Sequence, residues 1–196
     1  MTAVRQHPPP GELAPGRRDK LTRAQLAARR RRLAAFEFAG LLAFQAFHQM
    51  EHTLEVVQKR LGNERVSPLL GGVDFEWAHF TGNTLLFLGL VAVVAAYGGQ
   101  GGGAWRSRSN VAWAVLMGGV IVQGLHVVEH IVRVSQYVAT GRLPVGLATQ
   151  WVDPIWFHFS VNLVFLVALA VGFFGLRIPR DLHPTTPRPR QPSAAR

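Results

Sequence analysis

The chain of 196 residues contains no cysteine. Disulfides, thiolate metal sites and cysteine-held iron–sulfur clusters are therefore excluded. Acidic residues are also scarce, because 11 Asp and Glu stand against 21 Lys and Arg, which gives a formal net charge of +10. Any metal chemistry must therefore use histidine and a few carboxylates, and the excess of basic residues needs an explanation of its own.

The basic residues lie next to apolar segments. Arg17, Arg18 and the run 29–32 come shortly before the first long apolar stretch. This placement is typical of a membrane topology signal and of contact with anionic lipid headgroups. We therefore expect membrane lipids as partners and no binding to nucleic acid.

Four segments predict membrane-spanning helices. Apolar residues make up 48% of the chain, and the runs 85–97 and 161–174 are almost entirely apolar. With their flanks these runs reach about 20 residues, which crosses ~30 Å of hydrocarbon. The segments 33–57 and 111–137 are as long but also carry His and Glu. The sequence thus predicts an all-α, integral membrane four-helix bundle.

The remaining parts of the chain are rich in Pro, Gly and Arg. Residues 1–32 are predicted to be a basic arm, disordered over 1–20 and forming a juxtamembrane helix over 21–32. Residues 33–176 form the transmembrane domain, and 177–196 a disordered tail. Within the domain, the expected helices are about 33–58, from near Phe75 to the Gly-rich stretch 98–103, 110–137 and 154–176.

Two pairs of segments repeat without a gap. QAFHQMEHTLEVVQ at 45–58 matches QGLHVVEHIVRVSQ at 123–136, and VDFEWAHFTGN at 73–83 matches VDPIWFHFSVN at 152–162. The chain therefore reads as two tandem two-helix repeats, about 33–98 and 110–176. Because each repeat has two spans, both copies share one orientation, and a pseudo-twofold axis along the membrane normal is expected.

The repeated segments carry the candidate site. His, Glu and His at positions i, i+3 and i+4 lie on one face of a helix. At 1.5 Å per residue, His48 and His126 lie about 22 Å into their helices, level with the histidines one turn inside the outer ends of the other two. The candidate metal ligands are His48, Glu51, His52, His79, His126, Glu129, His130 and His158.

A bound metal explains why so many ionisable groups share one depth. Such groups are costly in a bilayer, and a cation offsets that cost by binding neutral imidazole and carboxylate. Eight donors exceed the needs of one ion, which favours a dinuclear site. One arrangement places three histidines on each metal, with Glu51 and Glu129 bridging or terminal, but ligands shared between repeats are equally compatible with the pattern.

Iron is the favoured metal, with zinc, copper and manganese as alternatives. A haem, a proton relay and a purely structural polar network are the alternatives to a metal site. Gln45, Asn83, Gln123 and Asn162, together with Thr81 and Ser160, are candidates for fixing the imidazole tautomers or for hydrogen bonding between helices. Glu55 and Arg133 occupy equivalent places in the two repeats. They are predicted either to pair across the axis or to lie exposed at the outer surface.

Two resemblances concern the motif alone. HxxEH also occurs in inverted zinc proteases. Ligands of the Glu-x-x-His type projecting from four helices resemble those of ferritin-like di-iron bundles. Histidine replaces most of the carboxylates here and the helices are duplicated in pairs, so neither activity is carried over.

The favoured function is an oxidoreductase acting on a lipid-soluble or small substrate, with a redox partner and with Glu51 and Glu129 as catalytic proton carriers. The alternatives are a haem-binding electron-transfer or metal-handling protein and a metal-dependent hydrolase. Sixteen Lys and Arg fall on one side of the predicted spans and five on the other. The expected location is the cell membrane, with both termini cytoplasmic.

Overall fold

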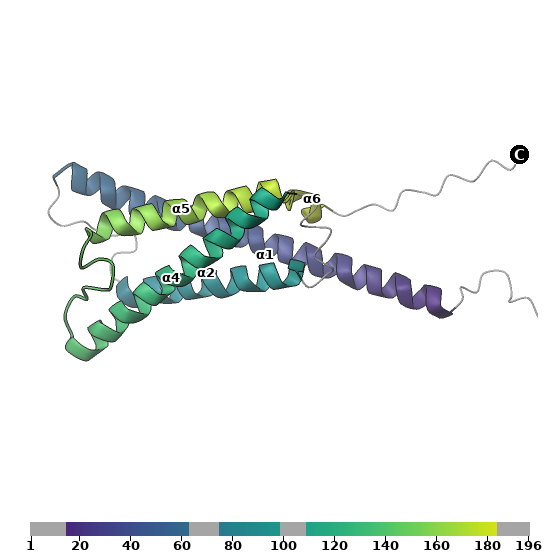
Figure 1. Cartoon of the computed structure of the whole chain (residues 1–196), viewed down its shortest axis with the longest axis horizontal. Helices are drawn as coiled ribbons and strands as arrows, with labels where there is room; N and C mark the ends of the chain where they lie inside the picture. Colours follow the sequence, from purple (N-terminus) through teal and green to yellow (C-terminus); the bar gives the residue numbers. More distant parts are fainter. Residues whose placement is uncertain (1–14, 63–74, 99–108, 184–196) are drawn as a thin grey trace, which may run out of the picture.

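The computed structural model describes residues 15–62, 75–98 and 109–183 (Figure 1). Helices are the only regular secondary structure of these residues, which contain no strand, as the sequence predicted. The helices are α1 (Pro15–Arg60), α2 (Phe75–Gly98), α4 (Asn110–Thr140), α5 (Pro154–Gly175) and α6 (Pro179–Leu182). The expected bounds of the second, third and fourth helices are confirmed to within three residues.

The four long helices pack side by side. Helix α1 packs against α2 and α5, and α4 packs against the same two helices from the other side. Figure 1 shows that the first part of α1 projects beyond the other helices. We call the end of the helices that is remote from this projection the distal end. There α1 and α4 finish, and α2 and α5 begin.

Three of these helices are long and apolar enough to cross a membrane: Glu76–Gly98, Asn110–Thr140 and Pro154–Gly175. Four were expected. Helix α1 falls short in apolar character because its latter half carries a buried polar stripe, and Gln45, Gln49 and Glu55 add to the histidines there. That stripe is buried against the other helices, so its polar side chains would not be exposed to lipid.

Helix α1 differs from the predicted arm. The sequence predicted disorder up to residue 20 and a separate helix over 21–32, but α1 runs unbroken from Pro15 to Arg60. No Gly or Pro occurs between residues 17 and 39 to interrupt it. Its 46 residues span about 69 Å. The hydroxyl of Tyr97 donates to the carbonyl of Arg31 at 3.0 Å, which ties this region to the end of α2.

The predicted disordered tail is also partly ordered. Leu176 and Ile178 are fully buried, and α6 packs against α1. Burial of these two side chains in the core holds residues 177–183 in place, so disorder beginning at Arg177 was wrong. The rest of that prediction, 184–196, lies outside the described residues, as does 1–14.

Local signals set the ends of α4 and α5. The Ser109 hydroxyl accepts from the Ala112 N–H at 3.1 Å, and Gly141 ends α4 in the left-handed conformation with φ of 63°. Asp153 caps α5 by accepting from two backbone N–H groups, and Pro154 occupies the first turn. Asp153 also pairs with Lys59, so this distal contact joins the end of α1 to the start of α5.

The interior has two halves of opposite character. Near the projecting arm, the core is apolar and includes Phe38, Leu90, Leu116, Phe165 and Leu169, all fully buried. In the distal half the buried side chains are mainly histidines, amides and charged groups. The outer faces are apolar, as Leu85, Ile121 and Leu125 are each more than 60% exposed. An apolar exterior around a polar interior is what a protein surrounded by lipid requires.

Candidate metal centre

The first group of histidines joins α1 to α2. His48 and His52 lie one turn apart on α1, and His79 lies in the second turn of α2. Their candidate ligand nitrogens all lie within 4.8 Å of one another, and all three residues are buried. The Nε2 atoms of His48 and His52 are 3.3 Å apart. We call these three residues group one.

The second group repeats this geometry on α4 and α5. His126 and His130 lie one turn apart on α4, and His158 lies in the second turn of α5. Their candidate ligand nitrogens also lie within 4.8 Å of one another and are buried. The Nε2 atoms of His126 and His130 are 3.2 Å apart. We call these residues group two.

The two groups are in contact. The rings of His52 and His158 stack with centroids 5.7 Å apart, and those of His79 and His130 stack at 5.8 Å. Each contact joins one residue of group one to one residue of group two. The structure therefore brings all six predicted histidines to one level of the bundle, which the matched depths in the sequence had predicted.

The spacing of the paired nitrogens suits a shared cation. Two ligands of a tetrahedral ion with metal–nitrogen bonds of 2.0–2.1 Å lie about 3.3–3.4 Å apart. His158 is also oriented for binding, because its Nδ1–H donates to the Pro154 carbonyl at 2.7 Å. That hydrogen bond leaves the buried Nε2 as the acceptor, and this atom has no hydrogen-bond partner in the described residues. Each group can thus hold a metal ion through three imidazoles.

The two predicted carboxylate ligands lie beside the histidines and belong to neither group. Glu51 has one oxygen 3.7 Å from Nδ1 of His48, the nitrogen that faces away from His52. Glu129 is turned toward the segment after α4: its Oε2 accepts from the N–H groups of Leu147 and Ala148, both at 2.9 Å. Its Oε1 accepts from the Thr149 hydroxyl at 3.1 Å.

The four amide residues form two matched pairs between helices. Gln45 donates to the Asn162 side-chain oxygen at 3.0 Å, and Gln123 donates to that of Asn83 at 2.9 Å. Each asparagine in turn donates at 2.9 Å to the backbone carbonyl of the histidine one turn before it. The Asn83 amide nitrogen also lies 3.4 Å from Nε2 of His130. The amides therefore link helices and support the histidine backbone in both repeats.

Two other expectations were wrong. Thr81 and Ser160 lie on exposed faces of their helices, away from the buried histidines. Glu55 and Arg133 are neither exposed nor paired with each other. Both are buried, Glu55 accepts from Nδ1 of His52 at 2.8 Å, and the guanidinium of Arg133 makes two hydrogen bonds to Glu76, at 3.0 and 2.5 Å.

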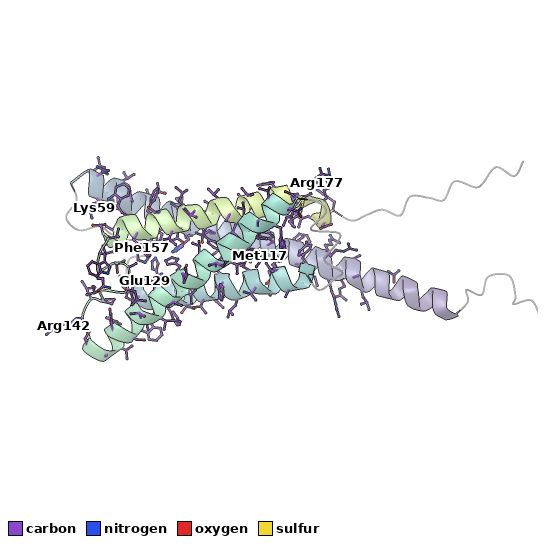
Figure 2. The ribbon with its side chains drawn as sticks, viewed as in Figure 1. Lys59, Met117, Glu129, Arg142, Phe157 and Arg177 are labelled. Carbon is purple, nitrogen blue, oxygen red and sulfur yellow. The ribbon has the colours of Figure 1, made fainter. Side chains whose placement is uncertain are left out.

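Glu76 was missed because its counterpart in the second repeat is Ile155. Both residues line a cavity of about 80 Å³ at the distal end, next to the histidines. The other lining residues are His52, Glu55, His79, His130, Arg133, Pro154 and His158. The cavity therefore contacts both groups, and the buried Glu76–Arg133 ion pair forms part of its wall. Figure 2 places Glu129 and Phe157 in this distal half, well away from Met117 and Arg177.

The distal surface carries one further charged contact. The Lys59 ammonium donates to the carboxylate of Asp153, and both side chains are about 40% exposed. This hydrogen bond, with two backbone N–H donors of α5, lowers the pKa of Asp153 below its ordinary value of 3.8. The ionised carboxylate thus caps α5 and anchors α1 at once.

The site therefore consists of two three-imidazole groups that contact each other, are supported by matched amides and lie beside one small cavity. Each of the two groups could hold a metal ion. No family model matches the chain, and neither the curated proteins nor the solved structures give a match.

Proposed function

We propose that this chain is an integral membrane metalloprotein that binds two transition metal ions, one in each histidine group, and acts as an oxidoreductase on a small substrate. The carrying observation is the burial of six imidazoles in two equivalent groups that share a cavity. Six buried polar rings are expensive unless cations or hydrogen bonds satisfy them. Bound metal would offset the cost of burying the six imidazoles. Two bound ions would also explain why the histidine group occurs twice.

The proposed setting is the cell membrane, with α1 as a fourth spanning helix. The apolar outer faces of α2, α4 and α5 support this, since they would meet lipid. The two repeats would be related by a pseudo-twofold axis along the membrane normal, as the matched amide pairs suggest. The excess of Lys and Arg at the arm end supports a cytoplasmic location for both termini, with the metal centre near the outer face.

The donor set bears on the metal. Iron was favoured on the expectation that Glu51 and Glu129 are ligands, because two histidines and one carboxylate are typical of non-haem iron. With Glu129 held by backbone N–H groups and Glu51 outside both histidine groups, the donors that remain are three imidazoles per ion. Imidazole suits copper and zinc as well as iron, and copper binds most tightly in the divalent series. Redox activity then favours copper or iron.

The cavity bears on the substrate. Small-molecule sites usually have volumes of ~300 Å³ or more, whereas this cavity has about 80 Å³. It fits a molecule of a few heavy atoms, which favours the small substrate over the lipid-soluble one and argues against haem. A hydrolase would need a carboxylate facing the metal-bound water as general base. Of the two carboxylates that line the cavity, Glu55 accepts from Nδ1 of His52 and Glu76 is paired with Arg133, which argues against hydrolysis.

The first test is the metal content of the purified, detergent-solubilised protein. We expect two metal ions per chain, copper or iron, reduced to one in His48→Ala and in His126→Ala. His183→Ala is the matched control. His183 is exposed and directly follows α6, at the opposite end of the bundle from the cavity (Figure 1). The proposal fails if neither group-directed variant binds less metal than this control. Reduction and reoxidation of the bound ions then separate an oxidoreductase from a metal-handling protein.

A further inference from the structure

The two histidine groups differ in what supports their outward nitrogens. In group one, Nδ1 of His52 donates to Glu55 at 2.8 Å, and Nδ1 of His48 lies 3.7 Å from Glu51. Both carboxylates are buried. Two imidazoles of this group therefore have an acidic residue behind them.

Group two has no such support. The Nδ1 atoms of His126 and His130 are buried and have no hydrogen-bond partner among the described residues. Glu129, the counterpart of Glu51, is taken up by three donors from residues 147–149. The counterpart of Glu55 is Arg133, a cation. The histidines of the two groups are otherwise equivalent, but the groups differ in these two contacts.

This difference changes how strongly each group holds a cation. A carboxylate behind a histidine fixes the ring, makes its other nitrogen a better donor and offsets the positive charge of the metal. Loss of such a partner typically weakens metal binding by about 10–100-fold. A guanidinium nearby acts in the opposite direction, because like charges repel strongly where water is excluded. Its pairing with Glu76 reduces that repulsion without supplying a hydrogen-bond acceptor to His130.

We infer that the two metal sites are unequal, that group one is the tight site, and that Glu55 is the residue that makes it so. This inference rests on the proposed function, since it assumes that both groups bind metal. Group one would stay occupied while the ion in group two exchanges. Group two is then the site at which metal is loaded last and lost first.

The test is a titration of the metal-free, detergent-solubilised protein with Zn²⁺, a redox-silent probe, against a competing chelator. The wild-type protein should bind two ions in two steps, with dissociation constants about 10–100-fold apart. Glu55→Gln should weaken the tight step by a similar factor and leave the weak step unchanged. The amide keeps the size of the side chain and an acceptor oxygen, so the fold is retained.

Two further variants assign the steps. His52→Ala should abolish the tight step and His130→Ala the weak one. A purely structural effect of Glu55→Gln would shift both steps together, and that result would overturn the inference, as would two equal steps in the wild-type protein. Absence of any bound Zn²⁺ is a different outcome, because it would overturn the proposed function itself.

Discussion

Glu129 aligns with Glu51 in the sequence, but its hydrogen-bond donors come from the segment after α4. The carboxylate is almost fully buried and accepts from two backbone N–H groups and one hydroxyl. Gly146 makes this approach possible. Its φ of +77° disfavours a side chain, and a Cβ there would collide with the Glu129 carboxylate.

Gly146→Ala should therefore destabilise the loop after α4. It adds a left-handed backbone penalty of about 1–2 kcal/mol and pushes a buried carboxylate off its donors, at a further ~1–3 kcal/mol. Thermal unfolding and limited proteolysis of residues 141–153 measure the effect. Gly141→Ala is the control, because Gly141 has a φ of +63° but nothing within 4 Å of its added Cβ. Equal losses in the two variants would contradict the role given to Glu129.

At single positions, the sequence predicted the histidines well and their neighbours poorly. The HxxEH spacing and the depths of His79 and His158 are properties of regular helices, so they carry over directly to three dimensions. The partner of a carboxylate depends on loop conformation and rotamers, which periodicity does not encode. Glu129 and Arg133 therefore found partners in residues 147–149 and Glu76 that no repeat could indicate.

At the scale of helices, α4 and α5 approach closely through glycine. A Cβ added at Gly119 would lie 2.8 Å from the Cβ of Ala168, whereas one at the neighbouring Gly118 would meet nothing within 4 Å. Small residues at such positions let helices pack closely in lipid. The pair of adjacent glycines thus offers a test of the α4–α5 contact within one turn of helix.

Gly119→Ala should destabilise the protein by about 1–3 kcal/mol, because the crowded contact forces the helices apart. Gly118→Ala should be neutral or stabilising by up to ~1 kcal/mol, because alanine favours helix. Thermal unfolding in detergent compares them. If both variants gain stability, α4 and α5 do not pack as described.

The Lys59–Asp153 contact joins α1 to the start of α5. Because the pKa of Asp153 in the folded protein lies below its ordinary value of 3.8, its contribution is complete above that value and is lost as the pH falls through the lowered one. Asp153→Asn retains an N-cap and loses the ion pair, at a cost of up to about 1 kcal/mol for an exposed pair. Asp153→Ala also loses the cap, at a further ~1 kcal/mol.

Unfolding measured between pH 3 and pH 7, at low and high salt, separates these contributions. The wild-type protein should lose stability with added salt and with acid, and Asp153→Asn should be less sensitive to both. A salt response that is unchanged in Asp153→Asn would show that the pair contributes nothing. The contact itself could not have been predicted, since Lys59 and Asp153 are 94 residues apart.

Across the whole molecule, the order of helices and the polar level were predictable, and the ends of the chain were not. Apolar runs and Gly-rich breaks define α2, α4 and α5 whatever surrounds them. The ordering of residues 177–183 depends on tertiary contacts, such as the burial of Ile178, whereas the length of α1 follows from the lack of Gly and Pro between residues 17 and 39. Composition alone suggested disorder there, because Arg and Pro are frequent.

The polar interior makes a prediction for the fold as a whole. Without metal, six buried imidazoles rely on one another and on the amides for hydrogen bonds, so the distal half should be the less stable part of the bundle. A ligand that binds only the folded state stabilises it by about 2.7 kcal/mol at 100 times its dissociation constant. Zn²⁺ should therefore raise the unfolding temperature by several degrees, and a chelator should reverse the gain.

The variant with both His48→Ala and His126→Ala is the control for this measurement, because it removes one ligand from each group. Its unfolding temperature should not respond to Zn²⁺ at concentrations that stabilise the wild-type protein. Alanine also leaves a cavity in place of each ring and removes a partner of a neighbouring imidazole, so the metal-free variant should be less stable than the metal-free wild type. A variant whose unfolding temperature still rises with Zn²⁺ as much as that of the wild type would show that the stabilising ions bind outside the two histidine groups.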